Sequence, residues 1–233
     1  MPDSIIAHTR EGGSIQSLSE HIAGVAQHCA QFLEQAGLPE LAPLGRLLAQ
    51  LHDAGKAQPA FQRYILGESA DKAPHSAAGA LLATKLLPSH PKGHPLKRTR
   101  IAQLLAYAIS GHHRGLYNYG GLETKLDDIG TKDRCKKAER ALSELMSEVP
   151  NWVKEHGART ESYLRKLANR VEEEEEQAQA LIRLLFSCLV DADFLDTEAF
   201  MDEERKERRH EATSGYASLE VLRDRLTMHM EGF

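Results

Sequence analysis

The sequence predicts an all-α fold, and three observations lead to that class. Apolar residues recur every three or four positions through most of the 233 residues, which is the spacing of one helix face. Capping residues, prolines and glycines divide these runs into segments of helix length. No strand-like alternation of useful length appears. Since no linker rich in Pro, Gly or Ser divides the chain, we expect a single domain over residues 1–233, with a core of about 15–200 and a C-terminal helical extension of about 201–233.

The composition is that of an ordinary soluble globular protein, with 41% hydrophobic and 27% charged residues. Neither a signal peptide nor an apolar run of membrane-spanning length is present, so we expect a cytoplasmic protein with no membrane partner. Three cysteines without a CxxC pair argue against a disulfide framework and against a cysteine zinc site. The formal net charge of -5 gives no overall attraction for nucleic acid. A polyanion would therefore have to be held by local basic groups or by metal ions.

The first two predicted helices carry histidines at their ends. Ser17 and Glu20 form a capping box that starts a helix ended by Gly37. His21 lies one position from the apolar stripe of that helix. The second helix runs from residue 39 into the segment Leu51-His52-Asp53-Ala54-Gly55-Lys56. The apolar face of this helix ends there, so His52 and Asp53 are expected at the boundary between the buried helix and the following turn. That position is suitable for a metal ion.

Three further predicted helices also end or begin at histidines. A short helix covers residues 59–66, and another runs from Pro74-His75-Ser76 to Leu87. A third begins near residue 96 and leads into Gly111-His112-His113-Arg114-Gly115-Leu116, where two glycines let the backbone turn both imidazoles toward one place. We expect His90 and His94, in the loop between these helices, to be solvated.

The second half of the chain adds carboxylates to this picture. A turn is expected at residues 130–134 and a charged helix over residues 132–146. The basic residues of this helix are better explained by a solvated face than by phosphate contacts. Residues 181–190 are apolar nearly all round, which predicts a helix at the centre of the core. Asp191-Ala192-Asp193 follows directly, and carboxylates there are costly unless they are paired or coordinate a metal.

The histidines and aspartates at these helix ends could gather into one metal site. Taken singly, His21 is more often a satisfied core side chain and the His52-Asp53 pair a surface pair, whereas a ligand role is slightly favoured for His112-His113. As a set, these residues supply ligands for two ions. Imidazole and carboxylate together suit Mn, Fe, Co, Ni or Zn, and the two oxygens of one carboxylate can bridge two ions. The candidate ligands are His21, His52, Asp53, His75, His112, His113 and one of Asp191 and Asp193.

In this order, these segments resemble the HD superfamily of metal-dependent phosphohydrolases. More closely, they resemble the HD nuclease domain of the CRISPR-associated helicase-nuclease of type I interference systems. The resemblance spans about residues 15–200. It is carried by Ser19-Glu20-His21, by His52-Asp53-Ala54-Gly55-Lys56 with Pro59-Ala60-Phe61-Gln62, by Pro74-His75-Ser76, by Gly111-His112-His113-Arg114-Gly115-Leu116 and by Asp191-Ala192-Asp193. The HDxGK turn followed by PxFQ, and the GHHxGL segment, separate this family from HD enzymes that act on nucleotides.

The resemblance implies a role for each residue. One ion would be held by His21, His52, Asp53 and Asp193, and Asp53 would bridge to a second ion held by His75, His112 and His113. Asp193 is preferred to Asp191 because the last ligand of the family stands in an Ala-Asp-aromatic context. Asp53 and Lys56 are the catalytic candidates, since Lys56 matches a family lysine that lies near the metals and could neutralise a phosphate oxygen.

The function that the resemblance implies is metal-dependent hydrolysis of phosphodiester bonds in single-stranded DNA. The expected cofactors are two divalent transition-metal ions, Mn, Fe, Co or Ni, with Mg and Zn less suitable. The expected partners are a helicase domain or subunit, since nothing here resembles a P-loop, and a CRISPR RNA-guided surveillance complex. Two alternatives stay open: an HD phosphohydrolase of nucleotides or cyclic nucleotides, and an interaction subunit that keeps a structural metal and does not cut.

Overall fold

The computed structural model describes residues 5–87, 100–168, 174–214, 217 and 219–231. The chain forms two compact units, residues 1–197 and 198–233. The expectation of one domain with a C-terminal extension remains a prediction. All candidate metal ligands lie in the first unit. His90 and His94, which are expected to be solvated, lie outside the described residues.

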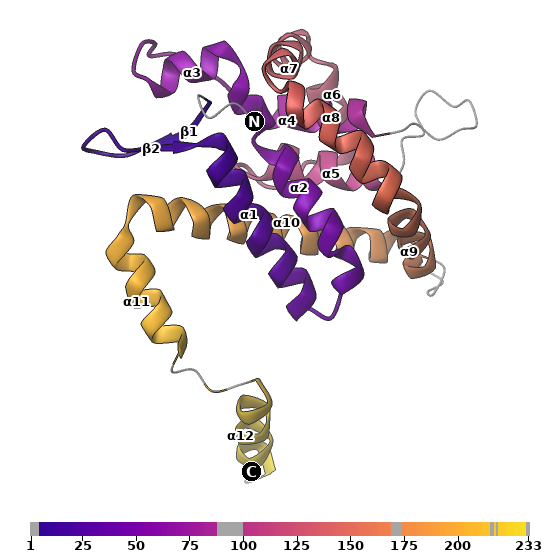
Figure 1. The fold of residues 1–233 in the computed structure, drawn as a ribbon. Helices are drawn as coiled ribbons and strands as arrows, with labels where there is room; N and C mark the ends of the chain where they lie inside the picture. Colours follow the sequence, from indigo (N-terminus) through magenta and orange to yellow (C-terminus); the bar gives the residue numbers. More distant parts are fainter. Residues whose placement is uncertain (1–4, 88–99, 169–173, 215–216, 218, 232–233) are drawn as a thin grey trace. The chain divides into compact units, whose positions relative to one another are not determined.

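Helices dominate the chain, which confirms the all-α class (Figure 1). The first unit opens with a short hairpin of β1 (Ile6–Thr9) and β2 (Ile15–Ser17), which the sequence pattern did not predict. The helical elements that follow are α1 (Leu18–Gln35), η1 (Pro39–Leu41), α2 (Ala42–His52), η2 (Ala54–Ala57), α3 (Pro59–Ile65), α4 (Ser76–Leu86), α5 (Arg100–Gly111), α6 (Tyr119–Asp127), α7 (Ile129–Ala141), α8 (Ser143–Trp152), η3 (Val153–Gly157), α9 (Ala158–Ala168) and α10 (Glu174–Met201). Among the described residues, no helix combines the length and apolarity needed to span a bilayer.

The predicted capping box sets the start of α1. The side-chain oxygen of Ser17 accepts a hydrogen bond from the Glu20 backbone, and the Glu20 carboxylate accepts one from the Ser17 backbone. Further along, α1 packs closely against α2, because Gly45 leaves room for the side chain of Leu33. α10 also contacts α1, where the Cys29 thiol donates to the Cys188 carbonyl at 3.5 Å. These contacts bring three elements that carry candidate ligands into one core.

Two sequence predictions about the second half need correction. Residues 130–134 are helical and not a turn, because α7 begins at Ile129, where the side chain of Asp128 caps the Thr131 backbone at 2.8 Å. α10 is buried along one stripe only: Leu185, Leu189 and Ala192 are fully buried, whereas Arg183 and Ser187 are exposed. The long apolar run therefore packs one face on the core instead of passing through its centre.

The second unit contains the end of α10, α11 (Glu203–Ser214) and α12 (Leu219–Glu231). Within this unit, the buried carboxylate of Glu198 forms ion pairs with Arg205 and Arg209. The aliphatic side chains of Leu222 and Leu226 on α12 are exposed. No candidate metal ligand lies in this unit.

Candidate metal centre

Asp53 occupies the centre of a cluster of imidazoles. It follows the last residue of α2, whose apolar face is fully buried, so the end of this helix lies inside the protein and not at its surface. His52 and Asp53 are 0% and 1% exposed. A carboxylate at such a depth must be compensated by positive charge or by metal ions.

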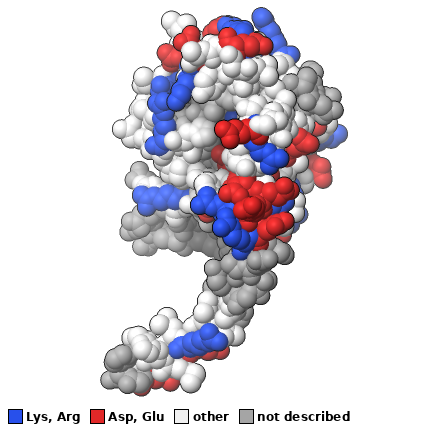
Figure 2. Space-filling model, turned by 90° about the vertical axis from the view of Figure 1, so that its left-hand side faces the viewer, with Lys and Arg blue, Asp and Glu red and all other residues white. Residues whose placement is uncertain are grey.

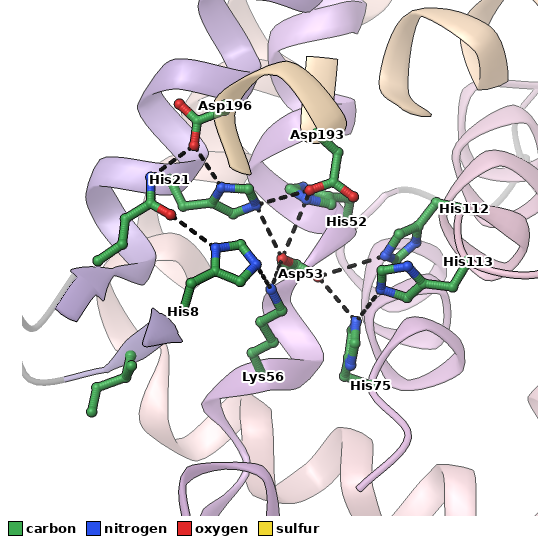
Figure 3. Close-up of polar contacts among 12 residues, drawn as sticks. His8, His21, His52, Asp53, Lys56, His75, His112, His113, Asp193 and Asp196 are labelled. Carbon is green, nitrogen blue, oxygen red and sulfur yellow. Dashed lines mark hydrogen bonds and ion pairs between the residues drawn. The ribbon is translucent and has the colours of Figure 1, made fainter. Parts of the chain in front are cut away.

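Each oxygen of Asp53 faces a different set of side chains (Figure 3). Oδ2 lies 3.3 Å from His21 Nε2 and 3.4 Å from His52 Nε2. Asp193 Oδ1 is 3.2 Å and 3.8 Å from the same two nitrogens. We call these four residues, His21, His52, Asp53 and Asp193, the first group; one ligand atom from each lies within 4.8 Å of the others.

The other oxygen of Asp53 belongs to the second group, which consists of Asp53, His75, His112 and His113. Oδ1 lies 3.2 Å from His75 Nε2 and 3.6 Å from His112 Nε2, and the Nε2 atoms of His75 and His113 are 2.9 Å apart. The ligand atoms of this group also lie within 4.8 Å of one another. One carboxylate is therefore shared by two sets of donors, as a pair of neighbouring cations requires.

Three imidazoles of the centre are oriented by contacts of Nδ1, the ring nitrogen that faces away from Asp53. His52 Nδ1 donates to the Ala49 carbonyl at 2.7 Å, and His112 Nδ1 donates to the Ile109 carbonyl at 2.6 Å. His21 Nδ1 lies 2.7 Å from a carboxylate oxygen of α10. Because a carbonyl only accepts, Nδ1 of His52 and of His112 carries a proton, so Nε2 is the nitrogen of each ring that is free to offer a lone pair to a metal ion.

The inward-facing atoms fit a metal site. Within the described residues, His21 Nε2, His52 Nε2, His112 Nε2 and both oxygens of Asp53 are buried and make no hydrogen bond of good geometry, although Asp53 Oδ2 forms an ion pair with Lys56. Buried polar atoms without partners are rare in folded proteins, and each needs an explanation. Divalent cations that accept imidazole and carboxylate ligands would satisfy all five atoms at once.

Two glycines allow α4 to approach the turn that carries Asp53. A Cβ atom on Gly55 would lie 2.1 Å from the His75 carbonyl oxygen, and one on Gly79 would lie 2.8 Å from the Leu51 carbonyl oxygen. The side chain of Gln58 donates to the Pro74 carbonyl at 2.9 Å and so holds the segment before His75. The glycine of the HDxGK turn is therefore needed for close backbone contact, which brings His75 to Asp53.

The carboxylates dominate the electrostatics of the first group. Burial lowers the pKa of His21, but the nearby carboxylates of Asp193 and Asp196 outweigh it and raise this pKa to about 10. Burial opposes a similar rise for His52, whose pKa reaches about 9 beside Asp53. Burial also tends to raise the pKa of Asp53, yet the charges of Lys56 and His52 hold this pKa well below its usual range.

In the second group, by contrast, the pKa values of two histidines are lowered. Burial lowers the pKa of His75, and burial together with the neighbouring His112 lowers the pKa of His113 to about 4. These two imidazoles are neutral near pH 7 and can offer lone pairs without losing a proton. The second group is also the more accessible one, since His75 is 12% exposed and His113 is an exposed residue.

We expect ion binding to release protons and to become tighter as the pH rises. With pKa values of about 10 and about 9, His21 and His52 are protonated at about pH 7 in chelator-treated protein, so an ion must displace those protons. In the metal-free protein, protonated His21 and His52 stabilise the fold. This stabilisation is complete below the ordinary histidine pKa of 6.5 and is lost as the pH rises through the raised pKa values of about 9 and about 10. Calorimetry of Mn or Co binding in buffers of different ionisation enthalpy measures the proton release. A binding constant that does not change between about pH 6 and about pH 9 would contradict the expectation.

The structure brings all seven predicted ligand residues to one place. It also separates two aspartates that the sequence pattern left as alternatives, because Asp193 faces His21 while Asp191 is exposed and belongs to neither group. Lys56 is buried, with Nζ 2.6 Å from Asp53 Oδ2. The assignment of these residues as metal ligands remains a prediction.

Three residues of the centre escaped the sequence analysis: His8, Gln16 and Asp196. Asp196 lies three residues after Asp193 on the same helix, so one helical turn of spacing could have suggested it. His8 is on β1 and Gln16 on β2, ahead of or at the very start of the segments that carry the family resemblance. Burial and the charge of Lys56 lower the pKa of His8 to about 4, so its ring is neutral.

An all-α unit in which a His-Asp pair serves two groups of imidazoles defines an HD-type phosphohydrolase. Comparison with protein families makes the assignment narrower. The family described as "Cas3, HD domain" matches residues 10–195, and the chain belongs to that family. A search of curated proteins finds no match. Membership makes the chain a metal-dependent hydrolase of the nuclease type with a CRISPR-associated role on nucleic acid, and it confirms the resemblance seen in the sequence.

Proposed function

We propose that this protein hydrolyses phosphodiester bonds of single-stranded DNA, using two divalent transition-metal ions. It acts together with a helicase domain or subunit on DNA that a CRISPR RNA-guided surveillance complex has opened. The position of Asp53 carries the proposal, because its two oxygens face two separate groups of imidazoles. Hydrolysis of a phosphodiester by two ions needs them about 3.5–4 Å apart, which a shared carboxylate favours.

The residues around Asp53 have different proposed roles. Together with Asp53, one ion would be bound by His21, His52 and Asp193, and the other by His75, His112 and His113. When bound, such ions lower the pKa of water toward neutrality and stabilise charge on phosphoryl oxygens. Lys56 places a buried ammonium group beside Asp53 and can neutralise a further phosphate oxygen.

The ligand chemistry supports transition metals. The first group offers two imidazoles and two carboxylates, and the second offers three imidazoles and the shared carboxylate. Mn, Fe, Co and Ni accept such mixed sets, whereas Mg prefers oxygen ligands and retains its waters. The partial exposure of His113 and Asp193 supports catalysis over a structural ion, since structural sites are closed by protein ligands on all sides.

Charge on the protein surface does not by itself explain binding of DNA. The net charge is -5, and in the upper part of Figure 2 the described Lys and Arg side chains lie in separate groups, with Asp and Glu among them. Local positive charge at the centre, from Lys56 and from bound ions, would offset this balance where the phosphate lies. The proposed contact therefore covers only a small part of the DNA, next to the phosphate that reacts.

A cleavage assay tests the proposal. Protein treated with a chelator and then supplied with Mn, Co or Ni is mixed with a single-stranded oligonucleotide, or with nucleotides and cyclic nucleotides in parallel. We expect fragments of the oligonucleotide and no turnover of the small substrates. Turnover of a cyclic nucleotide alone would replace the proposal with a nucleotide phosphohydrolase, and ion binding without any turnover would replace it with a structural metal site.

One surface feature bears on the nucleotide alternative. An open hollow of about 1220 Å³ is lined by residues of α6 and its flanks, from Tyr117 to Ile129. It contains none of the candidate ligands, so it does not enclose a base over the centre. A nucleotide phosphohydrolase would need such an enclosure next to its ions.

A further inference from the structure

We propose that the N-terminal hairpin is part of the catalytic apparatus: His8 positions Lys56, and Gln16 orients His21 through Asp196. The inference rests on the proposed nuclease function and assigns positioning roles to residues outside the candidate ligand set. Figure 3 shows the side chain of His8 between Lys56 and the hairpin, and Asp196 above His21.

The hydrogen bonds of His8 have a defined direction. The amide nitrogen of Gln16 lies 2.8 Å from the carboxylate of Asp196, so it donates there, and the amide oxygen is left to accept. That oxygen lies 2.8 Å from His8 Nδ1, which must therefore carry the proton. The lone pair of His8 Nε2 then faces the ammonium group of Lys56 at 3.0 Å. His8 is an acceptor that holds Lys56 beside Asp53.

The second branch of this network ends at a candidate ligand. Asp196 Oδ2 accepts from Gln16 and lies 2.7 Å from His21 Nδ1. The carboxylate of Asp196 sits directly over Gly24, where a Cβ atom would approach its Oδ1 to within 1.8 Å. A carboxylate partner on the outer nitrogen fixes the ring orientation of a metal-binding histidine and raises its basicity. Gln16 is thus the residue that joins Lys56 and His21.

The hairpin is built to present these two side chains together. His8 pairs with Gln16 across the two strands, so both side chains point to the same face of the ribbon. The register is irregular between Ile6 and His8, which gives β1 one extra residue at this point. The side chain of Gln62 accepts from the Ile6 backbone at 3.0 Å and donates to the Ile6 and Lys56 carbonyls at 3.0 Å and 2.8 Å. Gln62, the last residue of the PxFQ segment, therefore clamps β1 to the turn of Lys56.

The two branches predict different losses. Gln16→Met keeps the volume of the side chain but removes both amide hydrogen bonds, so Asp196 loses the donor that holds its carboxylate against His21. We expect the affinity for Co, measured by calorimetry and by the absorption of the bound ion, to fall about 10- to 100-fold, as is typical when such a partner is removed. His8→Leu should leave Co affinity within about threefold of the wild type while kcat falls about tenfold or more, because the charge of Lys56 is misplaced.

A double-mutant cycle separates positioning from general damage to the fold. In a Lys56→Ala background, His8→Leu should cause no further loss of kcat, because the group that it positions is gone. His8→Gln, which can still donate and accept, should recover part of the loss. His28→Leu and Gln31→Met on α1 are the matched controls, since they make the same changes away from the centre.

Several results would overturn the inference. Unchanged Co affinity in Gln16→Met, an equal loss of kcat from His8→Leu with and without Lys56, or equal losses in the two controls would each do so. If wild-type protein cleaves no single-stranded DNA, the proposed function fails, but the Co titrations of Gln16→Met and of wild type still decide the positioning of His21. Circular dichroism of each variant identifies those that have not folded, and His8→Ala, which also removes the acceptor facing Lys56, then replaces His8→Leu.

Discussion

Replacement of Asp53 by alanine is expected to abolish cleavage of single-stranded DNA in Mn or Ni buffer. Its two oxygens are the only part of the centre that faces both groups, so the substitution removes a ligand from each proposed ion site. Loss of a partner outside the ligand shell typically costs about 10- to 100-fold, so loss of the shared ligand should exceed about 100-fold. Initial rates of oligonucleotide cleavage measure the effect.

Two comparisons make this test specific. Asp53→Asn keeps the shape of the side chain but removes its charge and leaves one oxygen, which can serve only one group; we expect a loss nearly as large. Asp191→Ala removes an exposed carboxylate two residues from Asp193 and should change the rate little. All three variants should remain helical by circular dichroism. Activity retained by folded Asp53→Ala would remove the shared-ligand role.

The second large effect is expected for Gly55→Ala. The added Cβ would lie 2.1 Å from the carbonyl oxygen and 2.9 Å from the Cα atom of His75, and backbone atoms cannot move aside as the end of a flexible side chain can. The turn or the start of α4 must therefore shift. We expect a loss of about 2–3 kcal/mol in the free energy of unfolding, which is typical of overpacking. We also expect most of the activity to be lost, because His75 moves away from Asp53.

Denaturant unfolding and the cleavage assay measure the two losses separately. Gly120→Ala is the matched control, because a Cβ atom at this exposed glycine of α6 meets nothing within 4 Å. That variant should keep the stability and the activity of the wild type. If Gly55→Ala also unfolds at the wild-type denaturant concentration and cleaves normally, then close contact between this turn and His75 does not matter for the centre.

Local signals explain how much of the fold could be predicted from the sequence. The capping box of Ser17 and Glu20 defined the start of α1 because its two hydrogen bonds lie within four residues. The all-α class could be predicted from helical periodicity, from the capping and breaking residues between the helices and from the lack of strand-like alternation. Residues 130–134 contain Gly130, which is typical of a turn, but the side chain of Asp128 caps a helix that begins at Ile129. The burial of α10 was overestimated because an apolar run does not reveal which of its faces meets the core.

Some residues of the candidate centre could likewise be predicted from the sequence, and others could not. The histidines and Asp53 could be proposed because each stands at a helix end within a recognisable segment, and their convergence was implied by a family resemblance and not by spacing. Asp191 and Asp193 could not be separated from the residues alone, since the choice depends on the rotation of α10 about its axis. His8 gave no signal, because its role depends on a strand irregularity and on contacts with residues 48 positions away.

The two groups differ in how much of the chain must exist before they can form. Every member of the second group lies between residues 53 and 113, whereas the first group needs residues from 21 to 193. As a ribosome lengthens the nascent chain, the donors of the second group are all synthesised long before α10 appears. Asp193 is the last to arrive. A truncated translation product that stops before α10 therefore lacks one of the four residues of the first group, and the proposed site for one of the two ions stays incomplete until α10 has been synthesised.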